Sequence, residues 1–155
     1  MKIRNLILTA LMLALMVSSA CAQEGPPAPP AVSPFVGNVF NLTQQQPLSY
    51  DQEIAKQPLA DTATSSATLL QVRTGVKTHY HAYHDELVYV ISGKGVMEVG
   101  DHKQVIQAGD VISLVRGTVH SLTVKSTQPM VAISVISPPF DGIDRIYVGN
   151  AKEEE

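Results

Sequence analysis

The chain contains very little cysteine: Cys21 is the single one among 155 residues. One cysteine can form no disulfide within the chain and no cluster of thiolates around zinc. Charged residues are also scarce, at 16% of the sequence against about 25% in an average globular protein. This composition excludes a charge-laced coiled coil, and the 45% share of hydrophobic residues excludes a largely disordered chain.

Basic residues form no patch anywhere in the sequence. Eleven Lys and Arg stand against 14 Asp and Glu, which gives a formal net charge of −3. Nucleic-acid binding requires a positively charged surface, because the ligand's backbone is a dense array of phosphates. We therefore expect no nucleic-acid partner.

Residues 1–22 have the pattern of an export signal. Lys2 and Arg4 precede an apolar run over 6–17, and the small residues of Ser18-Ser19-Ala20 follow it. A basic start, a short apolar stretch and small residues are the three parts of a secretory signal. The run is shorter than the roughly 20 residues that span a bilayer. We expect export to the periplasm, with the domain beginning after the signal.

Two ways of processing this signal stay open. Ala20-Cys21-Ala22 offers a small-x-small site with cleavage before Gln23. Alternatively, Ser-Ser-Ala-Cys resembles a bacterial lipoprotein box, in which Cys21 becomes the lipidated first residue. In that case the membrane is a partner only through a lipid on Cys21, and Ala22 at the next position favours the outer membrane. If the signal is instead cleaved before Gln23, Cys21 is a small residue of the discarded signal.

The segments that follow differ in composition. Residues 23–34 hold five prolines in twelve, which favours an extended, polyproline-like spacer without a core. The folded domain is expected over 35–148 and an acidic tail over 149–155. Near the start of the domain, Ser49 and Gln52 can cap a short helix, which Pro58 would end.

After this point the sequence shows no helical periodicity. Short apolar or alternating runs recur, separated by the turn signals Gly93-Lys94-Gly95, Gly100-Asp101 and Gly109-Asp110. The predicted strands are Thr68–Val72, Leu87–Ile91, Val96–Val99, Gln104–Ile106, Val111–Val115, Val119–Val124 and Met130–Ile136, and a last strand or arm is expected over Asp141–Val148. Many short strands with glycine turns predict an all-β fold, an antiparallel sandwich or barrel. Apolar residues on both faces of Leu87–Ile91 indicate a covered outer face, as in a homodimer.

One cluster of side chains carries the chemistry. His79 and His81 lie two residues apart, so on a strand they point to the same face. Glu86 opens the next predicted strand and can supply a carboxylate. His120 alternates with Leu122 and therefore points into the core. Three neutral imidazoles and a carboxylate suit a divalent transition metal, without distinguishing iron, manganese, nickel or zinc.

This cluster carries a family resemblance. His79-Tyr80-His81, four residues, Glu86, six residues and Gly93 resemble the first motif of the cupin superfamily. Gly75 lies closer to His79 than the glycine that usually opens that motif.

A second stretch resembles the other cupin motif: Gly109, five residues, Val115, Gly117 and His120. Val115 takes the place of the usual proline, and the 15 residues of 94–108 separate the two motifs, as in compact cupins. The resemblance implies a jelly-roll barrel, or double-stranded β-helix, with its motif core over 65–137. It also implies a metal site whose ligands are His79, His81, Glu86 and His120.

Residues near this cluster each allow two interpretations. His84 and Asp85 form either a fifth ligand or proton shuttle at the mouth, or an exposed loop pair. Arg73 lies on the strand before the histidines and either clamps a carboxylate substrate or forms a salt bridge at the rim. The remaining neighbours have simpler expectations: Gln71 could line the pocket, Tyr80 and Tyr83 face away, Arg116 is solvated, and His102 is not a ligand.

The cupin resemblance admits several functions. We expect an exported metal-binding cupin, with a small-molecule metalloenzyme of the dioxygenase type ahead of the other classes. The alternatives are a manganese lyase or decarboxylase, a sugar isomerase, or a periplasmic cupin module that binds a ligand or metal without catalysis. The sequence offers no strong general acid or base beyond the four ligands, which favours metal-centred chemistry or plain binding.

Overall fold

The computed structural model describes residues 34–149. It contains one short helix, α1 (Val39–Gln45), and ten strands: β1 (Ile54–Asp61), β2 (Ser66–Val72), β3 (Gly75–Tyr80), β4 (Asp85–Ser92), β5 (Lys94–Val99), β6 (His102–Gln107), β7 (Val111–Leu114), β8 (His120–Val124), β9 (Met130–Ser137) and β10 (Ile146–Tyr147). The predicted export signal and the acidic tail from residue 150 lie outside the described residues, as does all but the last residue of the proline-rich spacer. Within 34–149, no helix is long and apolar enough to cross a membrane.

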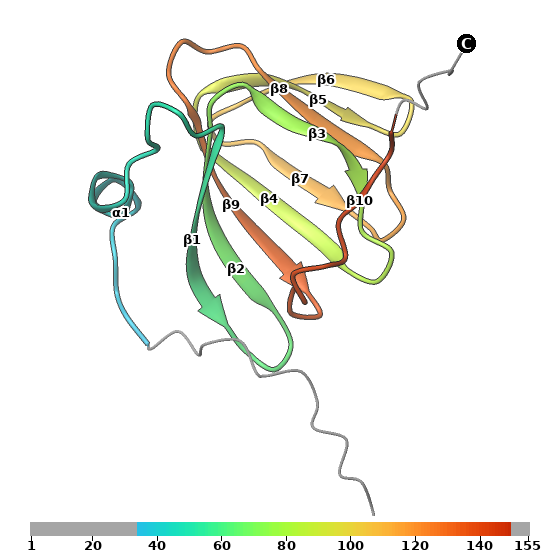
Figure 1. Ribbon diagram of the computed structural model, residues 1–155, viewed down its shortest axis with the longest axis horizontal. Coiled ribbons are helices and arrows are strands. Elements are labelled where there is room, and N and C mark those ends of the chain that lie inside the picture. The colour runs from blue at the N-terminus through green and yellow to red at the C-terminus, as the bar shows by residue number, and fades with distance from the viewer. Residues whose placement is uncertain (1–33, 150–155) are drawn as a thin grey trace, which may run out of the picture.

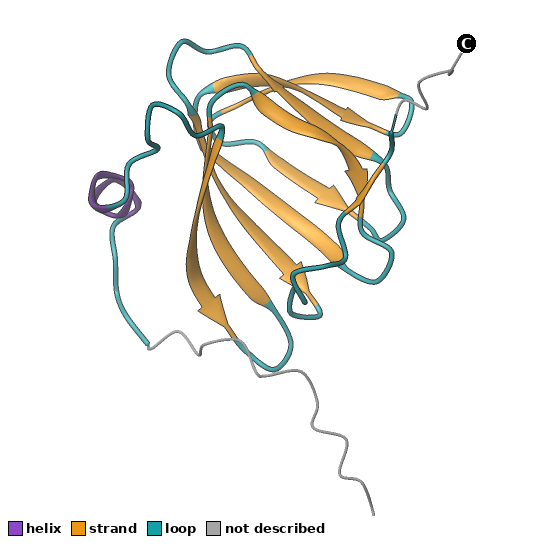
Figure 2. Cartoon of the chain, viewed as in Figure 1, coloured by secondary structure: helices purple, strands orange, loops and turns teal. Residues whose placement is uncertain are grey.

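The strands form two five-stranded sheets that face each other (Figures 1 and 2). The first, called the β4 sheet here, has the order β1-β2-β9-β4-β7, and the second, the β8 sheet, has the order β10-β3-β8-β5-β6. Every neighbouring pair is antiparallel. This arrangement is a double-stranded β-helix, or jelly roll, and the predicted all-β fold class is confirmed.

Each strand predicted from the apolar runs is present, but the expectation of a helix after Ser49 is wrong. The capping contact itself forms, because the Ser49 N–H donates to Gln52 Oε1 at 3.2 Å, yet it closes only a turn. Residues 54–61 then pair with β2 as an edge strand. Pro58 is tolerated there, next to a bulge, because an edge strand needs no N–H on its open side. The helix that does form, α1, starts after Asn38, whose side chain accepts the N–H groups of Phe40 and Asn41.

Alternation along the strands separates the core from the outer surface. In β4, Val90 is fully buried, whereas Leu87 and Tyr89 are 46% and 47% exposed. In β9, Met130, Ala132, Ser134 and Ile136 are all buried. The outer face of β4 is therefore uncovered in a single chain, and the homodimer expected from its apolar residues stays a prediction.

The pairing of β3 with β8 aligns two histidines across the sheet. Gly75 lies opposite Thr123, and a bulge between Val76 and His79 shifts the register so that His79 faces His120. Since side chains alternate with a period of two, such a shift decides which ones meet on one face. At Gly75 a Cβ atom would collide with the carbonyl oxygen of Leu122. Glycine there allows β3 to approach β8 closely.

The chain after β9 is an arm rather than a full strand. It runs from residue 138 to 149 and contributes only the two residues of β10, which pair with Tyr80 and His79 of β3 (Figure 1). The arm therefore lies along β3, the strand that carries His79.

Candidate metal centre

Both sheets supply side chains to one buried cluster. His79 lies near the end of β3, His81 follows that strand directly, and His120 is the first residue of β8. Their exposed fractions are only 2%, 2% and 5%. Glu86 reaches the cluster from β4 in the opposite sheet, so the four side chains from the two predicted motifs come together where the sheets meet.

In each of the three histidines, Nδ1 is hydrogen-bonded and Nε2 is free. Nδ1 of His79 and of His120 each lie 2.8 Å from a main-chain carbonyl, that of Lys77 and of Thr118 respectively. Nδ1 of His81 contacts the carbonyl of Asp144. A carbonyl oxygen can only accept, so each Nδ1 carries the hydrogen and each neutral ring keeps a lone pair on Nε2.

These three Nε2 atoms are buried and have no hydrogen-bond partner. One ligand nitrogen from each histidine lies within 4.8 Å of the others. An unpartnered buried polar atom costs free energy, and three of them converging on one point is the arrangement that a metal ion satisfies. The cluster of His79, His81 and His120 can thus hold a metal ion.

Glu86 stands beside the cluster. Its Oε2 atom lies 3.5 Å from Nε2 of His120 and 3.7 Å from Nε2 of His81. Its Oε1 accepts a 2.5 Å hydrogen bond from Ser134 of β9, which orients the carboxylate. Burial acts to raise the pKa of Glu86, but the contacts with His120 and Ser134 outweigh it and hold that pKa below its usual value. The carboxylate is therefore ionised and available at the cluster.

The surroundings also keep His79 neutral. The pKa of His79 is lowered to about 4, mainly by burial and also by the nearby His120, Arg145 and His81, while the hydrogen bond to Lys77 acts in the opposite direction. Metal ions bind imidazole in its neutral form. His79 is in that form throughout the physiological range of pH.

His84 matches neither the predicted fifth ligand nor the predicted exposed loop residue. It is buried, with 4% exposure, and both ring nitrogens are engaged. Nδ1 lies 2.5 Å from Asp144 Oδ2, and Nε2 lies 3.1 Å from the carbonyl of Pro139. Because each nitrogen already faces a hydrogen-bond acceptor, neither is free to bind a metal. The expectation of an exposed loop residue is wrong, and that of a fifth ligand has no free nitrogen to support it.

Asp144 joins the arm to the loop that carries His81. Its carboxylate accepts the N–H groups of Ala82 and Tyr83, both at 2.8 Å, and the Nδ1 hydrogen of His84. Burial acts to raise the pKa of Asp144, but these hydrogen bonds outweigh it and lower that pKa to about 2. The sequence analysis missed this residue, since nothing in the primary structure joins two segments 60 residues apart.

The other singled-out residues lie outside the cluster. Arg73 donates to the carbonyls of Gln52 and Ser49 and does not line the cavity next to the cluster. The ion pairs of residues 34–149 include none of Arg73, so neither predicted role, carboxylate clamp or salt bridge at the rim, is supported. Gln71 donates to the carbonyl of Gln46 and does not line the cavity next to the cluster. The remaining expectations agree with the structure: Tyr80 and Tyr83 do not line that cavity, Arg116 is exposed and pairs with Asp85, and His102 is exposed on β6.

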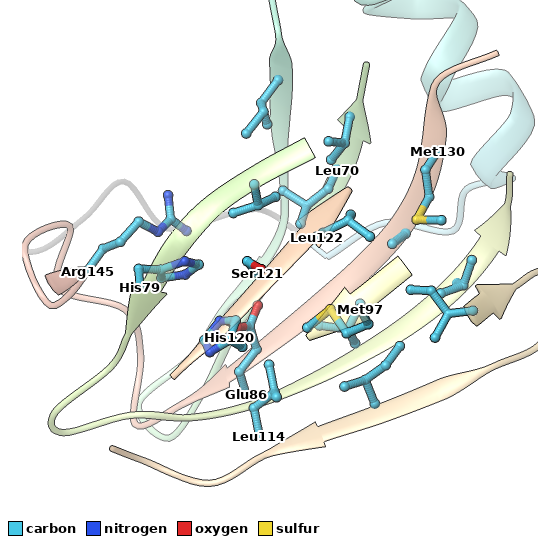
Figure 3. A pocket seen from close by; sticks show the side chains of 18 of the residues that line it. Leu70, His79, Glu86, Met97, Leu114, His120, Ser121, Leu122, Met130 and Arg145 are labelled. Atoms are coloured by element: carbon cyan, nitrogen blue, oxygen red, sulfur yellow. The ribbon is translucent and has the colours of Figure 1, made fainter. Parts of the chain in front are cut away.

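A cavity of about 70 Å³ adjoins the cluster between the sheets (Figure 3). His79, His120 and Glu86 line one part of it. Most of the remaining lining is apolar and includes Leu70, Val72, Val88, Val90, Met97, Leu114, Leu122 and Met130. Two cationic residues that the sequence analysis did not select, Lys56 of β1 and Arg145 of the arm, line it as well. Lys56 lies in the segment that the sequence analysis interpreted as a helix, so its position on a strand that lines the cavity was not predicted.

The fold and the site define a double-stranded β-helix protein with a buried cluster of three histidines. Residues 68–136 match the family model described as a cupin domain. The chain belongs to the cupin superfamily.

Individual proteins resemble this chain in sequence or in fold. An uncharacterised protein of Aquifex aeolicus is 31% identical over 97 residues, which cover 63% of this chain and 79% of that protein. The structure of KdgF from a Halomonas species aligns with a TM-score of 0.57 and 22% identity, over 64% of this chain and 92% of KdgF. An uncharacterised double-stranded β-helix protein of Klebsiella pneumoniae aligns with a TM-score of 0.59 and 19% identity, over 68% and 91% of the two chains. At these identities the two structures support the fold alone.

The link through Asp144 generates a prediction about stability. Asparagine at position 144 keeps one acceptor oxygen but turns an N–H₂ group toward a donor, so at least one of three buried hydrogen bonds is lost. We expect Asp144→Asn to lower the free energy of unfolding by about 2–4 kcal/mol, measured by urea denaturation at neutral pH.

A neighbouring carboxylate provides the matched control. Asp141 accepts the N–H groups of Ile143 and Asp144 with a single oxygen, Oδ1, which asparagine retains. Asp141→Asn should therefore change the free energy of unfolding by less than about 1 kcal/mol. Equal losses in the two variants would contradict the assigned role of Asp144.

Proposed function

We propose that this protein is an exported, metal-dependent cupin enzyme of the dioxygenase type that acts on a small organic molecule. The proposed ligands are His79, His81, Glu86 and His120. The observation that carries the proposal is the convergence of three buried Nε2 atoms without partners. Imidazole and carboxylate donors accept several first-row divalent ions, and oxygenase chemistry selects iron among them.

The composition of the cavity supports metal-centred chemistry. Among the described residues that line it, the only carboxylate is Glu86 and the only imidazoles are those of His79 and His120. If these three side chains bind the metal, few side chains are left for general acid–base catalysis. A bound ferrous ion would supply electrons and open coordination positions for dioxygen. In a dioxygenase reaction both oxygen atoms of dioxygen end in the organic product, so no further reductant is needed.

The chain itself contributes positioning and the exclusion of water. The carbonyls of Lys77, Thr118 and Asp144 fix the three imidazoles in the Nδ1–H form, with Nε2 toward the cluster. Ser134 orients the carboxylate of Glu86. The apolar lining between the sheets keeps bulk water from the reacting part of a bound substrate.

The location of the protein is part of the proposal. The signal-like residues 1–22 support export to the periplasm, and Cys21 supports anchoring to the outer membrane through a lipid. The uncovered apolar face of β4, with Leu87 and Tyr89, supports a homodimer.

The ligand assignment predicts which histidines are needed for metal. His79→Ala, His81→Ala and His120→Ala should each lower the affinity for Zn²⁺ by at least about a hundredfold, measured by competition with a chelator. Glu86→Ala should have a milder effect, because water can fill one position of the shell.

His102→Ala is the control, since this histidine is exposed on β6 and should leave the affinity unchanged. Circular dichroism checks that each variant is folded. If folded His84→Ala loses the metal while His79→Ala keeps it, the ligand assignment is wrong.

Oxygen consumption tests the reaction class. The Fe²⁺-loaded protein should consume dioxygen in the presence of a suitable member of a panel of small carboxylic acids and phenols, measured with an oxygen electrode. Folded His120→Ala should show no such consumption. If the loaded protein binds members of the panel but consumes no oxygen with any of them, it is a non-enzymatic binding module or an enzyme of another class.

Replacement of the single cysteine tests the anchor. In a bacterial host, Cys21→Ser should release the protein from the membrane fraction or block its processing, because the lipid attachment point is gone. Fractionation and N-terminal sequencing provide the measurement. A soluble mature protein that starts at Gln23 both with and without the substitution would rule out the lipoprotein.

A further inference from the structure

Two cations reach the cavity from opposite sheets. Lys56 lies on β1, the edge strand of the β4 sheet, and Arg145 directly precedes β10, the edge strand of the β8 sheet. Both line the same cavity as His79, Glu86 and His120. Figure 3 shows Arg145 beside His79, while Leu70, Leu122 and Met130 lie farther along the cavity. One end of the cavity therefore combines positive charge with the metal cluster.

Neither cation has an acidic partner within residues 34–149. The ion pairs of that region involve other basic groups. The Nε atom of Arg145 is buried without a hydrogen-bond partner, and the guanidinium lies over the ring of Phe140, at 5.7 Å from the ring centre. A buried guanidinium donor that lacks an acceptor is rare, because its desolvation is left uncompensated. The Nε donor of Arg145 is therefore available to an anionic acceptor.

The local charges point the same way. Partial burial lowers the pKa of Lys56, the positive charge of Arg145 lowers it further, and Glu86 acts in the opposite direction. The charge of Arg145 therefore acts on Lys56 more strongly than that of Glu86 does. A divalent metal at the histidines would make this end of the cavity still more positive.

We propose that Lys56 and Arg145 form an anion subsite that binds the carboxylate of a small, otherwise apolar acid. The planar guanidinium of Arg145 offers parallel N–H donors that match the two oxygens of a carboxylate, and Lys56 adds a point charge. The apolar part of the acid lies among Leu70, Leu122 and Met130. The carbon atoms next to the carboxylate then lie nearest to the histidines.

This inference rests on the proposed function only in taking the bound acid as the substrate. The subsite itself consists of side chains that are present without metal, so it can be tested on the metal-free protein. That separates failure of the subsite from failure of the metal chemistry.

Butyrate is the probe, and 1-butanol is its uncharged counterpart. Isothermal titration of the full chain, stripped of metal, extends to about 50 mM ligand, a range that covers the millimolar affinity expected of so small a molecule. Butyrate should bind and 1-butanol should bind at least about tenfold more weakly. Arg145→Gln should raise the dissociation constant of butyrate at least about tenfold, and Lys56→Gln about three- to tenfold.

Two cations outside the cavity provide matched controls. Arg116 pairs with Asp85, and Lys103 pairs with Glu98, both on the exposed surface. Arg116→Gln and Lys103→Gln should leave the dissociation constant within about twofold of the unaltered protein. Retained Zn²⁺ affinity in Arg145→Gln and Lys56→Gln shows that these variants still fold around the cluster.

Several results would overturn the subsite. Absence of butyrate binding, equal binding of 1-butanol, or unchanged binding in folded Arg145→Gln each contradicts it, even if the metal and oxygen experiments succeed. Tighter binding of inorganic phosphate than of butyrate would overturn the assignment to a carboxylate. If butyrate binding depends on Arg145 and Lys56 but the protein consumes no oxygen, the subsite is supported and only the proposed reaction is contradicted.

Discussion

The site depends on one repeated interaction, the hydrogen bond from Nδ1 of each clustered histidine to a main-chain carbonyl. These bonds tie the imidazoles of His79, His120 and His81 to the backbone at Lys77, Thr118 and Asp144. They fix both the tautomer and the direction of each ring, and all three Nε2 atoms converge as a result. Leaving those atoms unpaired costs about 1–3 kcal/mol each, a cost that a bound ion would offset.

Much of the fold and of this cluster could be predicted from the sequence because the information is local. The two-residue spacing of His79 and His81, the inward phase of His120 and the glycine turns each depend on a few neighbouring residues. The partners of the site could not be predicted in this way. Asp144 and Arg145 reach it through the arm, and Lys56 through a strand whose pairing with β2 overrides a local helix signal.

The two sheets divide the tasks of the site. In the β8 sheet, β3, the loop that follows β3 and β8 carry the three histidines. The β4 sheet supplies Glu86 and its hydrogen-bond donor Ser134. The arm then connects the site to the rest of the fold, since Asp144 holds the loop of His81 and Arg145 faces the cavity. The same short segment therefore supports a proposed metal ligand and supplies a charge for the proposed substrate.

The central claim is that the three Nε2 atoms bind one metal ion. The most direct test is a crystal structure of the protein loaded with Co²⁺ or Zn²⁺, with the ion located by anomalous scattering. We predict one strong peak about 2.0–2.3 Å from Nε2 of His79, His81 and His120, with an oxygen of Glu86 moved into bonding distance. A fully loaded crystal with the ion elsewhere, or with these Nε2 atoms bonded to ordered water instead, would contradict the account.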